Sequence, residues 1–219
     1  MEPGSPYFSQ VELLVRILPL VARQKCFALK GGTAINLFVR DLPRLSVDID
    51  VTYLPVHPRD EALAAMDAAL RALQSDLEKQ LPGMRVVGAT LAGTGYYYKL
   101  VAQLEAVQVK IEVSPVMRGV VEPSVLMGTS AQTRLTFGYV QVPVVAFNDL
   151  YAGKLCAALS RQHPRDLFDV AILLRNEGLN EQFLEVFLVY LACSNRPMAE
   201  LLDPVKYELD RGLLKNFQG

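Results

Sequence analysis

The segment at residues 27–53 constrains the fold of this chain more than any other stretch. An apolar run ends at Lys30, and Gly31 and Gly32 follow it directly. The next apolar residues recur at helical spacing, so we expect a strand, a glycine pair and a short helix with Thr33 as its N-cap. Glycines at such a junction let backbone N–H groups approach an anion closely, which suits a phosphate. The plain alternative is a simple turn.

The same segment ends in a second expected strand, residues 47–51, that carries two aspartates. Side chains alternate between the two faces of a strand, so Asp48 and Asp50 share one face about 7 Å apart. Ser46 falls on that face, and Arg44 lies in the loop before it. Neighbouring carboxylates repel each other unless a cation lies between them. The pattern indicates a hard divalent cation, Mg²⁺ or Mn²⁺, and its alternative is a solvated strand face.

More strands are expected over residues 84–113, where short apolar runs are separated by turn residues. In the last of these strands, apolar residues alternate with Lys110 and Glu112, which therefore share one face. That polar face can align with the face of Asp48 and Asp50, or it can be an ordinary strand surface.

Two helices in the last third of the chain carry basic and acidic residues at regular spacing. Residues 149–160 predict a helix on which Lys154 shares a face with the following Arg161. The next helix begins within HPRDLFDV, and its Asp166 and Asp169 lie three residues apart near the positive N-terminus. The alternative is that both rows are solvated helix faces.

The remaining elements are expected to form the scaffold. Residues 8–23 predict a helix with Ser9 as its N-cap, and residues 58–80 predict the clearest helix of the chain. The apolar stripe of that second helix consists of Ala62, Leu63, Met66, Leu70, Leu73 and Leu77. Residues 114–144 indicate only loops and short strands, and Asn148 is the expected N-cap of the helix that follows. Short helical pieces are expected at residues 198–205 and 209–214.

Composition limits the class of protein. The chain has 219 residues, of which 51% are hydrophobic, enough for one large domain or for a core domain with a helical one. No apolar run reaches ~18 residues and the N-terminus lacks a signal-peptide plan, so no membrane partner is expected. Cys26, Cys156 and Cys193 lie among apolar neighbours, which indicates buried, reduced thiols in a cytoplasmic protein. A net charge of −1 argues against a protein that coats nucleic acid.

The motifs resemble those of the nucleotidyltransferase superfamily. Its signature is a glycine pair, a spacer and Asp-x-Asp, which here is LKGGTAINLF followed by RLSVDID. The sequence is most similar to the AbiEii branch, the toxins of AbiE-type toxin–antitoxin systems, with the related MenT-like toxins. Those proteins also carry a K-L-x-A-x-x-x-R helix followed by R-D-x-x-D, found here between Lys154 and Asp169. The resemblance implies an α/β (α+β) fold, with a mixed sheet flanked by helices over residues 1–144 and a helical domain over residues 145–219.

The resemblance also implies roles for these residues. The superfamily usually carries a third carboxylate on a later strand, and Glu112 is the matching position. The implied catalytic residues are Asp48, Asp50, Glu112, Lys154, Asp166 and Asp169, of which the first three would bind the metal. The implied nucleotide-binding residues are Lys30, Gly31, Gly32, Thr33, Arg44, Ser46, Lys154 and Arg161. Three roles stay open for Asp166 and Asp169: binding ribose or the acceptor, orienting Lys154, or completing the site.

The implied activity is transfer of an NMP unit from an NTP to an acceptor, with Mg²⁺ or Mn²⁺ as cofactor. MenT-like relatives modify the 3′ end of tRNA, so an RNA acceptor and an AbiEi-like antitoxin partner are expected. Two alternatives stay open. One is a nucleotidyltransferase that acts on a small molecule or a protein hydroxyl, and the other is a non-catalytic nucleotide-binding module.

Overall fold

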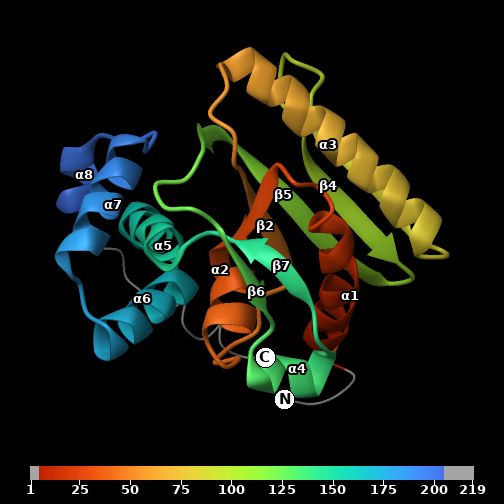
Figure 1. Ribbon diagram of the computed structural model, residues 1–219, viewed down its shortest axis with the longest axis horizontal. Coiled ribbons are helices and arrows are strands. Elements are labelled where there is room, and N and C mark those ends of the chain that lie inside the picture. Colours follow the sequence, from red (N-terminus) through yellow and green to blue (C-terminus); the bar gives the residue numbers. More distant parts are fainter. Residues whose placement is uncertain (1–4, 205–219) are drawn as a thin grey trace. The chain divides into compact units, whose positions relative to one another are not determined.

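The computed structural model describes residues 5–204 of the chain. It divides into two compact units. The first comprises the chain up to Val120 together with Ser124–Val145, and the second comprises Val121–Pro123 and the chain from Ala146 onward. Figure 1 shows the sheet and helices α1–α4 of the first unit and helices α5–α8 of the second.

A mixed sheet of seven strands, counted over the described residues, forms the centre of the first unit. The strands are β1 (Phe27–Lys30), β2 (Asp48–Tyr53), β3 (Arg85–Thr90), β4 (Tyr97–Leu104), β5 (Val107–Arg118), β6 (Val125–Gly128) and β7 (Gln141–Val144). Their order across the sheet is β3-β4-β5-β2-β1-β7-β6. β2 runs parallel to β5 and β1 runs parallel to β7, while the other neighbours are antiparallel. The expected α/β fold with a mixed sheet is therefore confirmed.

Helices α1 (Pro6–Val21) and α3 (Arg59–Gln80) pack on the sheet and on each other (Figure 1). α1 contacts β5 and β7, and α3 contacts β3, β4 and β5. All six residues of the apolar stripe expected on α3 are buried. The apolar residues of the central strands, such as Ile49 and Ile111, are 0% exposed. The periodicity of the sequence thus identified this part of the core correctly.

The N-terminus of α1 lies earlier than expected. The hydroxyl of Ser5 accepts a hydrogen bond from the Phe8 N–H at 3.2 Å, and Pro6 occupies the first turn. The expectation that Ser9 caps this helix is wrong, because Ser9 already lies inside it. Proline fits the first turn since its missing N–H would have no partner within the helix there.

The chain turns from β1 into a helix at the glycine pair, but the helix begins at Gly31 itself. α2 (Gly31–Ala34) continues directly into a π-helical turn, η1 (Ile35–Val39). Lys30 occupies the N-cap position. The expectation that Thr33 caps this helix is therefore wrong, because Thr33 lies within it and its hydroxyl bonds to the neighbouring strand.

Residues 114–144 contain a helix that the sequence analysis missed. β5 extends to Arg118, and α4 (Ala131–Phe137) lies between β6 and β7. The hydroxyl of Ser130 accepts the Thr133 N–H at the start of α4. Phe137 at its end packs against Phe8 of α1, with ring centroids 4.8 Å apart. Seven residues make about two turns, which is too short for a helical apolar period to stand out.

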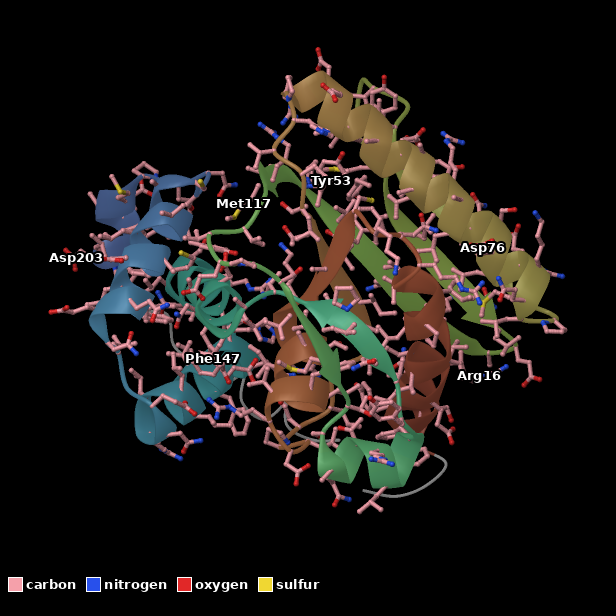
Figure 2. All side chains as sticks on the ribbon, in the orientation of Figure 1. Arg16, Tyr53, Asp76, Met117, Phe147 and Asp203 are labelled. Atoms are coloured by element: carbon pink, nitrogen blue, oxygen red, sulfur yellow. The ribbon has the colours of Figure 1, made fainter. Side chains whose placement is uncertain are left out.

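Tyr53, labelled in Figure 2, closes the end of β2 and is 2% exposed. Its ring meets Phe27 of the adjacent β1 edge-on, at a centroid distance of 6.3 Å. Its hydroxyl lies 3.0 Å from Nδ1 of His57. These contacts give His57 a structural role at the end of the strand.

The second unit is helical, with α5 (Phe147–Arg161), α6 (Pro164–Asn176), α7 (Glu181–Ala192) and α8 (Met198–Leu202). Asn180 caps α7 by accepting the Phe183 N–H at 2.8 Å. The expectation that Asn148 caps α5 is wrong: α5 begins at Phe147, and the Asn148 amide donates to Glu122 Oε1 at 2.9 Å. The helical piece expected at residues 209–214 lies outside the described residues.

Asp149 is a buried residue that ties the short segment Val121–Pro123 to this helical unit. Its carboxylate accepts the N–H groups of Val121 and Glu122 at 2.7 and 2.9 Å and the hydroxyl of Tyr190 at 2.9 Å. Burial, together with the neighbouring negative charge of Asp149, raises the pKa of Tyr190 above its usual range. Tyr190 therefore stays a protonated donor and holds α7 to α5.

The cysteines differ from expectation. Cys193 is exposed and Cys26 and Cys156 are half-buried, so the expectation of three buried thiols is wrong, although all three thiols are free. Burial raises the pKa of the Cys156 thiol to about 11, which keeps it protonated near neutral pH. Among residues 5–204, no helix combines the length and the apolar content that a membrane crossing requires.

Candidate active site

Four charged residues lie in one line across four neighbouring strands. The strand register pairs Lys99 of β4 with Glu112 of β5, Glu112 with Asp50 of β2, and Asp50 with Lys30 of β1. Residues paired in register project from the same face of a sheet. We call Lys99, Glu112, Asp50 and Lys30 the charged row. It places the expected Glu112 on the same face as the Asp-x-Asp motif.

Asp48 extends this group along β2, because it lies two residues from Asp50 and therefore projects from the same face. Its partner in register is Lys110 of β5. Asp48 is exposed, whereas Asp50 and Glu112 are half-buried. The polar faces of β2 and β5 thus align, which is the arrangement that the alternating sequence permitted but could not establish.

Lysines flank the two carboxylates of the charged row. Lys99 Nζ lies 3.1 Å from Glu112 Oε2, and the two side chains are 24% and 45% exposed. The hydrogen bond from Lys99 to Glu112 raises the pKa of the lysine. Burial lowers the pKa of Lys30, although the charges of Asp50 and Glu112 act in the opposite direction. The row contains two negative and two positive side chains, so it is close to neutral when all four are charged.

The glycine turn lies directly against this row. Gly31 has a φ of +72°, and a Cβ built on it would come within 2.5 Å of Asp50 Oδ2. A Cβ on Gly32 would come within 2.8 Å of Ser46 Oγ and 3.0 Å of Arg44 Nη2. Only glycine combines this left-handed conformation with so close an approach. Four residues of the expected nucleotide-binding set therefore lie together at this turn, and Gly31 lies against Asp50.

Thr33 fastens the turn to the Asp-x-Asp strand. Its hydroxyl donates a hydrogen bond to the main-chain carbonyl of Asp48 and lies 3.1 Å from Ser46 Oγ. Thr33 is 0% exposed. The hydroxyl of Thr33 therefore fixes the position of the glycine turn relative to β2.

The expected three-carboxylate metal site is only partly assembled. Over residues 5–204, no group of three or more histidine, cysteine, aspartate or glutamate side chains is arranged to hold a metal ion. The donor chemistry fits, because Asp48, Asp50 and Glu112 offer hard oxygen ligands from one face of the sheet. Glu112 is engaged by Lys99, so one of the three expected ligands has a cationic partner already.

A second cluster lies within the helical unit and unites the other expected residues. Lys154 Nζ of α5 lies 2.8 Å from Asp166 Oδ1 and 3.2 Å from Asp169 Oδ2 of α6. Arg161 Nε lies 2.6 Å from Asp166 Oδ2. Lys154, Asp166 and Asp169 are 7%, 2% and 0% exposed, while Arg161 is 64% exposed. We call these four residues the buried ion-pair network.

Burial excludes the interpretation that Asp166 and Asp169 belong to a solvated helix face. Burial alone would raise the pKa of Asp166, but the hydrogen bond from Arg161 and the charge of Lys154 outweigh it and lower that pKa. Both aspartates pair with Lys154, and the choice among their three open roles stays a prediction. His163 is the N-cap of helix α6, and its Nδ1 accepts the Arg165 N–H at 3.2 Å.

Sequence reasoning missed Lys99. It is the lysine of YYYKLVAQL, where it alternates with the buried Leu100 and therefore lies on the polar face of β4. The alternation in the sequence predicts that Lys99 lies on the polar face of its strand. It does not predict the pairing with Glu112, because that pairing depends on the register between β4 and β5.

A solved structure of low sequence identity shares the fold of this chain. The nucleotidyltransferase toxin MenT4 from Mycobacterium tuberculosis superposes with a TM-score of 0.65 at 18% identity, over 93% of this chain and 74% of MenT4. ANT(2″)-Ia in complex with adenylyl-2″-tobramycin gives a TM-score of 0.45 at 15% identity, over 84% of this chain and 98% of that one. No curated protein sequence matches this chain.

The family can be stated more narrowly. The sequence model of the nucleotidyl transferase AbiEii toxin family, from type IV toxin–antitoxin systems, matches residues 12–219. This chain therefore belongs to the AbiEii family of nucleotidyltransferase toxins, and the resemblance drawn from its motifs is confirmed. The family implies an NTP substrate and an antitoxin partner.

Proposed function

We propose that this protein transfers an NMP unit from an NTP to RNA, at the 3′ end of tRNA, with Mg²⁺ or Mn²⁺ as cofactor. One observation supports the chemistry above all others: Asp50 and Glu112 face each other on neighbouring strands, and the Gly31 turn lies against Asp50. Family membership supports the reaction type. The choice of tRNA follows from the resemblance to the MenT-like toxins.

We assign Asp48, Asp50 and Glu112 as the ligands of the metal ion. When bound there, a divalent cation would neutralise charge on the triphosphate and lower the pKa of the attacking hydroxyl. The three carboxylates hold their positions through the paired strands β2 and β5. Nucleotidyl transfer asks little covalent chemistry of the protein, so placing charge on rigid strands is the main requirement.

We assign binding of the NTP phosphates to the glycine turn. Gly31 and Gly32 present backbone N–H groups without a side chain in the way, and Arg44 and Ser46 lie against Gly32. Arg44 offers a guanidinium, which binds phosphate oxygens well. Lys30 adds a positive charge beside Asp50, and Thr33 keeps the turn in place.

The proposal gives Lys154 the task of balancing triphosphate charge. An ammonium group has three N–H donors. Two of these meet Asp166 and Asp169, which therefore fix the orientation of the ammonium group. Asp166 and Asp169 act as positioning residues, and Arg161 supports Asp166 from the exposed side.

The experiment that tests this proposal follows label from each of the four α-³²P NTPs into total tRNA, protein and small molecules. The wild type with Mg²⁺ is expected to label the 3′ end of tRNA. Asp50→Asn should fold normally by circular dichroism and transfer nothing. Asp76→Asn is the matched control, because Asp76 lies on α3 (Figure 2), and it should keep full activity.

Other outcomes have definite meanings. Label in protein or in a small molecule would replace RNA as the acceptor. NTP binding that needs no divalent cation and survives Asp50→Asn, with no transfer to any acceptor, would identify a non-catalytic nucleotide-binding module. Co-expression with an AbiEi-like antitoxin should relieve growth arrest caused by the wild type, and Asp50→Asn should cause no arrest.

A further inference from the structure

We infer that Lys99 is a built-in counter-ion that occupies Glu112 until a divalent cation replaces it, and that its released ammonium group then binds the nucleotide phosphates. This inference rests on the proposed function. It couples metal binding and nucleotide binding through a single side chain that none of the sequence motifs contains.

The first step is the competition for Glu112. Lys99 Nζ lies 3.1 Å from Glu112 Oε2, so the ammonium group occupies an oxygen that the expected metal site needs. A cation bound by Asp48, Asp50 and Glu112 would have to displace it. Among the described residues no three-ligand group is assembled, and Glu112 is paired with Lys99.

The second step is the difference between the two lysines of the charged row. Lys99 is 24% exposed and Glu112 45% exposed, so their ion pair lies near water and little free energy is needed to break it. Lys30, in contrast, is the last residue of β1 and the N-cap of α2, directly at the glycine turn. Like every lysine, Lys99 has a long, flexible stem, so its charge can move without moving the strand. Lys99 is therefore the exchangeable partner of the pair.

The third step is where the released charge goes. Removing Lys99 from Glu112 leaves an ammonium group beside a bound dication, and the two repel each other. A triphosphate supplies the negative charge that relieves this repulsion. Metal and nucleotide thus favour each other's binding, and the coupling acts equally in both directions because binding free energies are linked.

The test measures Mn²⁺ binding to the nucleotide-free full-length protein by electron paramagnetic resonance. Lys99→Met should bind Mn²⁺ at least about fivefold more tightly than the wild type, a typical size for coupling between sites. The same variant should bind the Mg²⁺ complex of a non-hydrolysable NTP analogue more weakly. Opposite changes in the two affinities are the signature, because a merely structural role would weaken both.

Lys110→Met is the matched control. Lys110 is exposed on the same face of β5, opposite Asp48, so its removal deletes the same charge without touching the Lys99–Glu112 pair. It should change Mn²⁺ affinity much less than Lys99→Met. Lys99→Arg keeps a cation at Glu112 and should resemble the wild type in Mn²⁺ binding. Equal tightening in Lys110→Met and Lys99→Met would overturn the inference, since general charge would then be the cause.

Failure of the inference can be told from failure of the proposed function. If Asp50→Asn abolishes Mn²⁺ binding while Lys99→Met leaves it unchanged, the metal site stands and the counter-ion role is wrong. If Asp50→Asn binds Mn²⁺ like the wild type, the metal site itself is wrong and the inference falls with it.

Discussion

Replacing Asp166 by asparagine should destabilise the helical unit much more than removing its exposed partner Arg161. Asp166 is 2% exposed and bonds both Lys154 and Arg161, at 2.8 and 2.6 Å. Removing one partner of a buried pair costs about 3–5 kcal/mol, because the other charge is left buried. Lys154 keeps Asp169 at 3.2 Å, so we expect the lower end of this range.

The matched comparison is Arg161→Met. Arg161 is 64% exposed, and pairs with an exposed partner are worth at most about 1 kcal/mol. Urea denaturation followed by far-ultraviolet circular dichroism measures both free energies of unfolding. The reasoning is refuted if Arg161→Met costs as much as Asp166→Asn, or if Asp166→Asn costs less than about 1 kcal/mol.

The same comparison should depend on pH. The pKa of Asp166 is lower in the folded protein than its usual 3.8, owing to Arg161 and Lys154 and despite its burial. Its ionised form therefore stabilises the fold above the unfolded value, and this contribution is lost as the pH falls through the folded pKa. Asparagine does not titrate, so the difference between wild type and Asp166→Asn should shrink below pH 3.8. A difference that stays constant on acidification would contradict the assignment.

Three further substitutions test the glycine turn and the contacts of Asp149. Gly31→Ala should cost about 1–2 kcal/mol for its left-handed conformation alone, and since its Cβ would collide with Asp50 it should also weaken nucleotide binding. Thermal denaturation and calorimetric titration check both effects, and an unchanged affinity would separate Asp50 from the nucleotide site. Asp149→Asn should cost about 1–3 kcal/mol, because its amide would face an N–H donor at Val121 or Glu122. Tyr190→Phe removes only one of the three bonds to Asp149 and should cost less in the same denaturation assay.

Periodic features of the chain were predictable from the sequence, and pairings between distant segments were not. The α3 stripe appeared correctly because a helical period extends over twenty-two residues. The polar faces of β2 and β5 were each evident from alternation. Their register was not, since β2 pairs with a strand that follows it only after α3, β3 and β4. The partner of Lys99 depends on that register, and so no local pattern pointed to it.

Helix caps failed for a related reason. Ser5 and Ser9 are both suitable N-caps by residue type, and the choice between them depends on where Pro6 starts the helix. Thr33 was a plausible cap by type, but its hydroxyl bonds the Asp48 carbonyl on a strand fifteen residues away. Asn148 likewise serves Glu122. In each case several local solutions were open, and a tertiary contact selected one.

The charged row and the buried ion-pair network contain the same kinds of side chain but differ in burial. Each joins two carboxylates to two cations, so each is close to neutral. In the charged row the Lys99–Glu112 pair is near water, where breaking an ion pair costs little and another cation can take its place. In the buried ion-pair network, Lys154, Asp166 and Asp169 are almost fully buried, and separating them would leave charge in a medium that solvates it poorly. Burial, more than residue type, therefore separates the Lys99–Glu112 pair, which we propose to be exchangeable, from the fixed pairs of the helical unit.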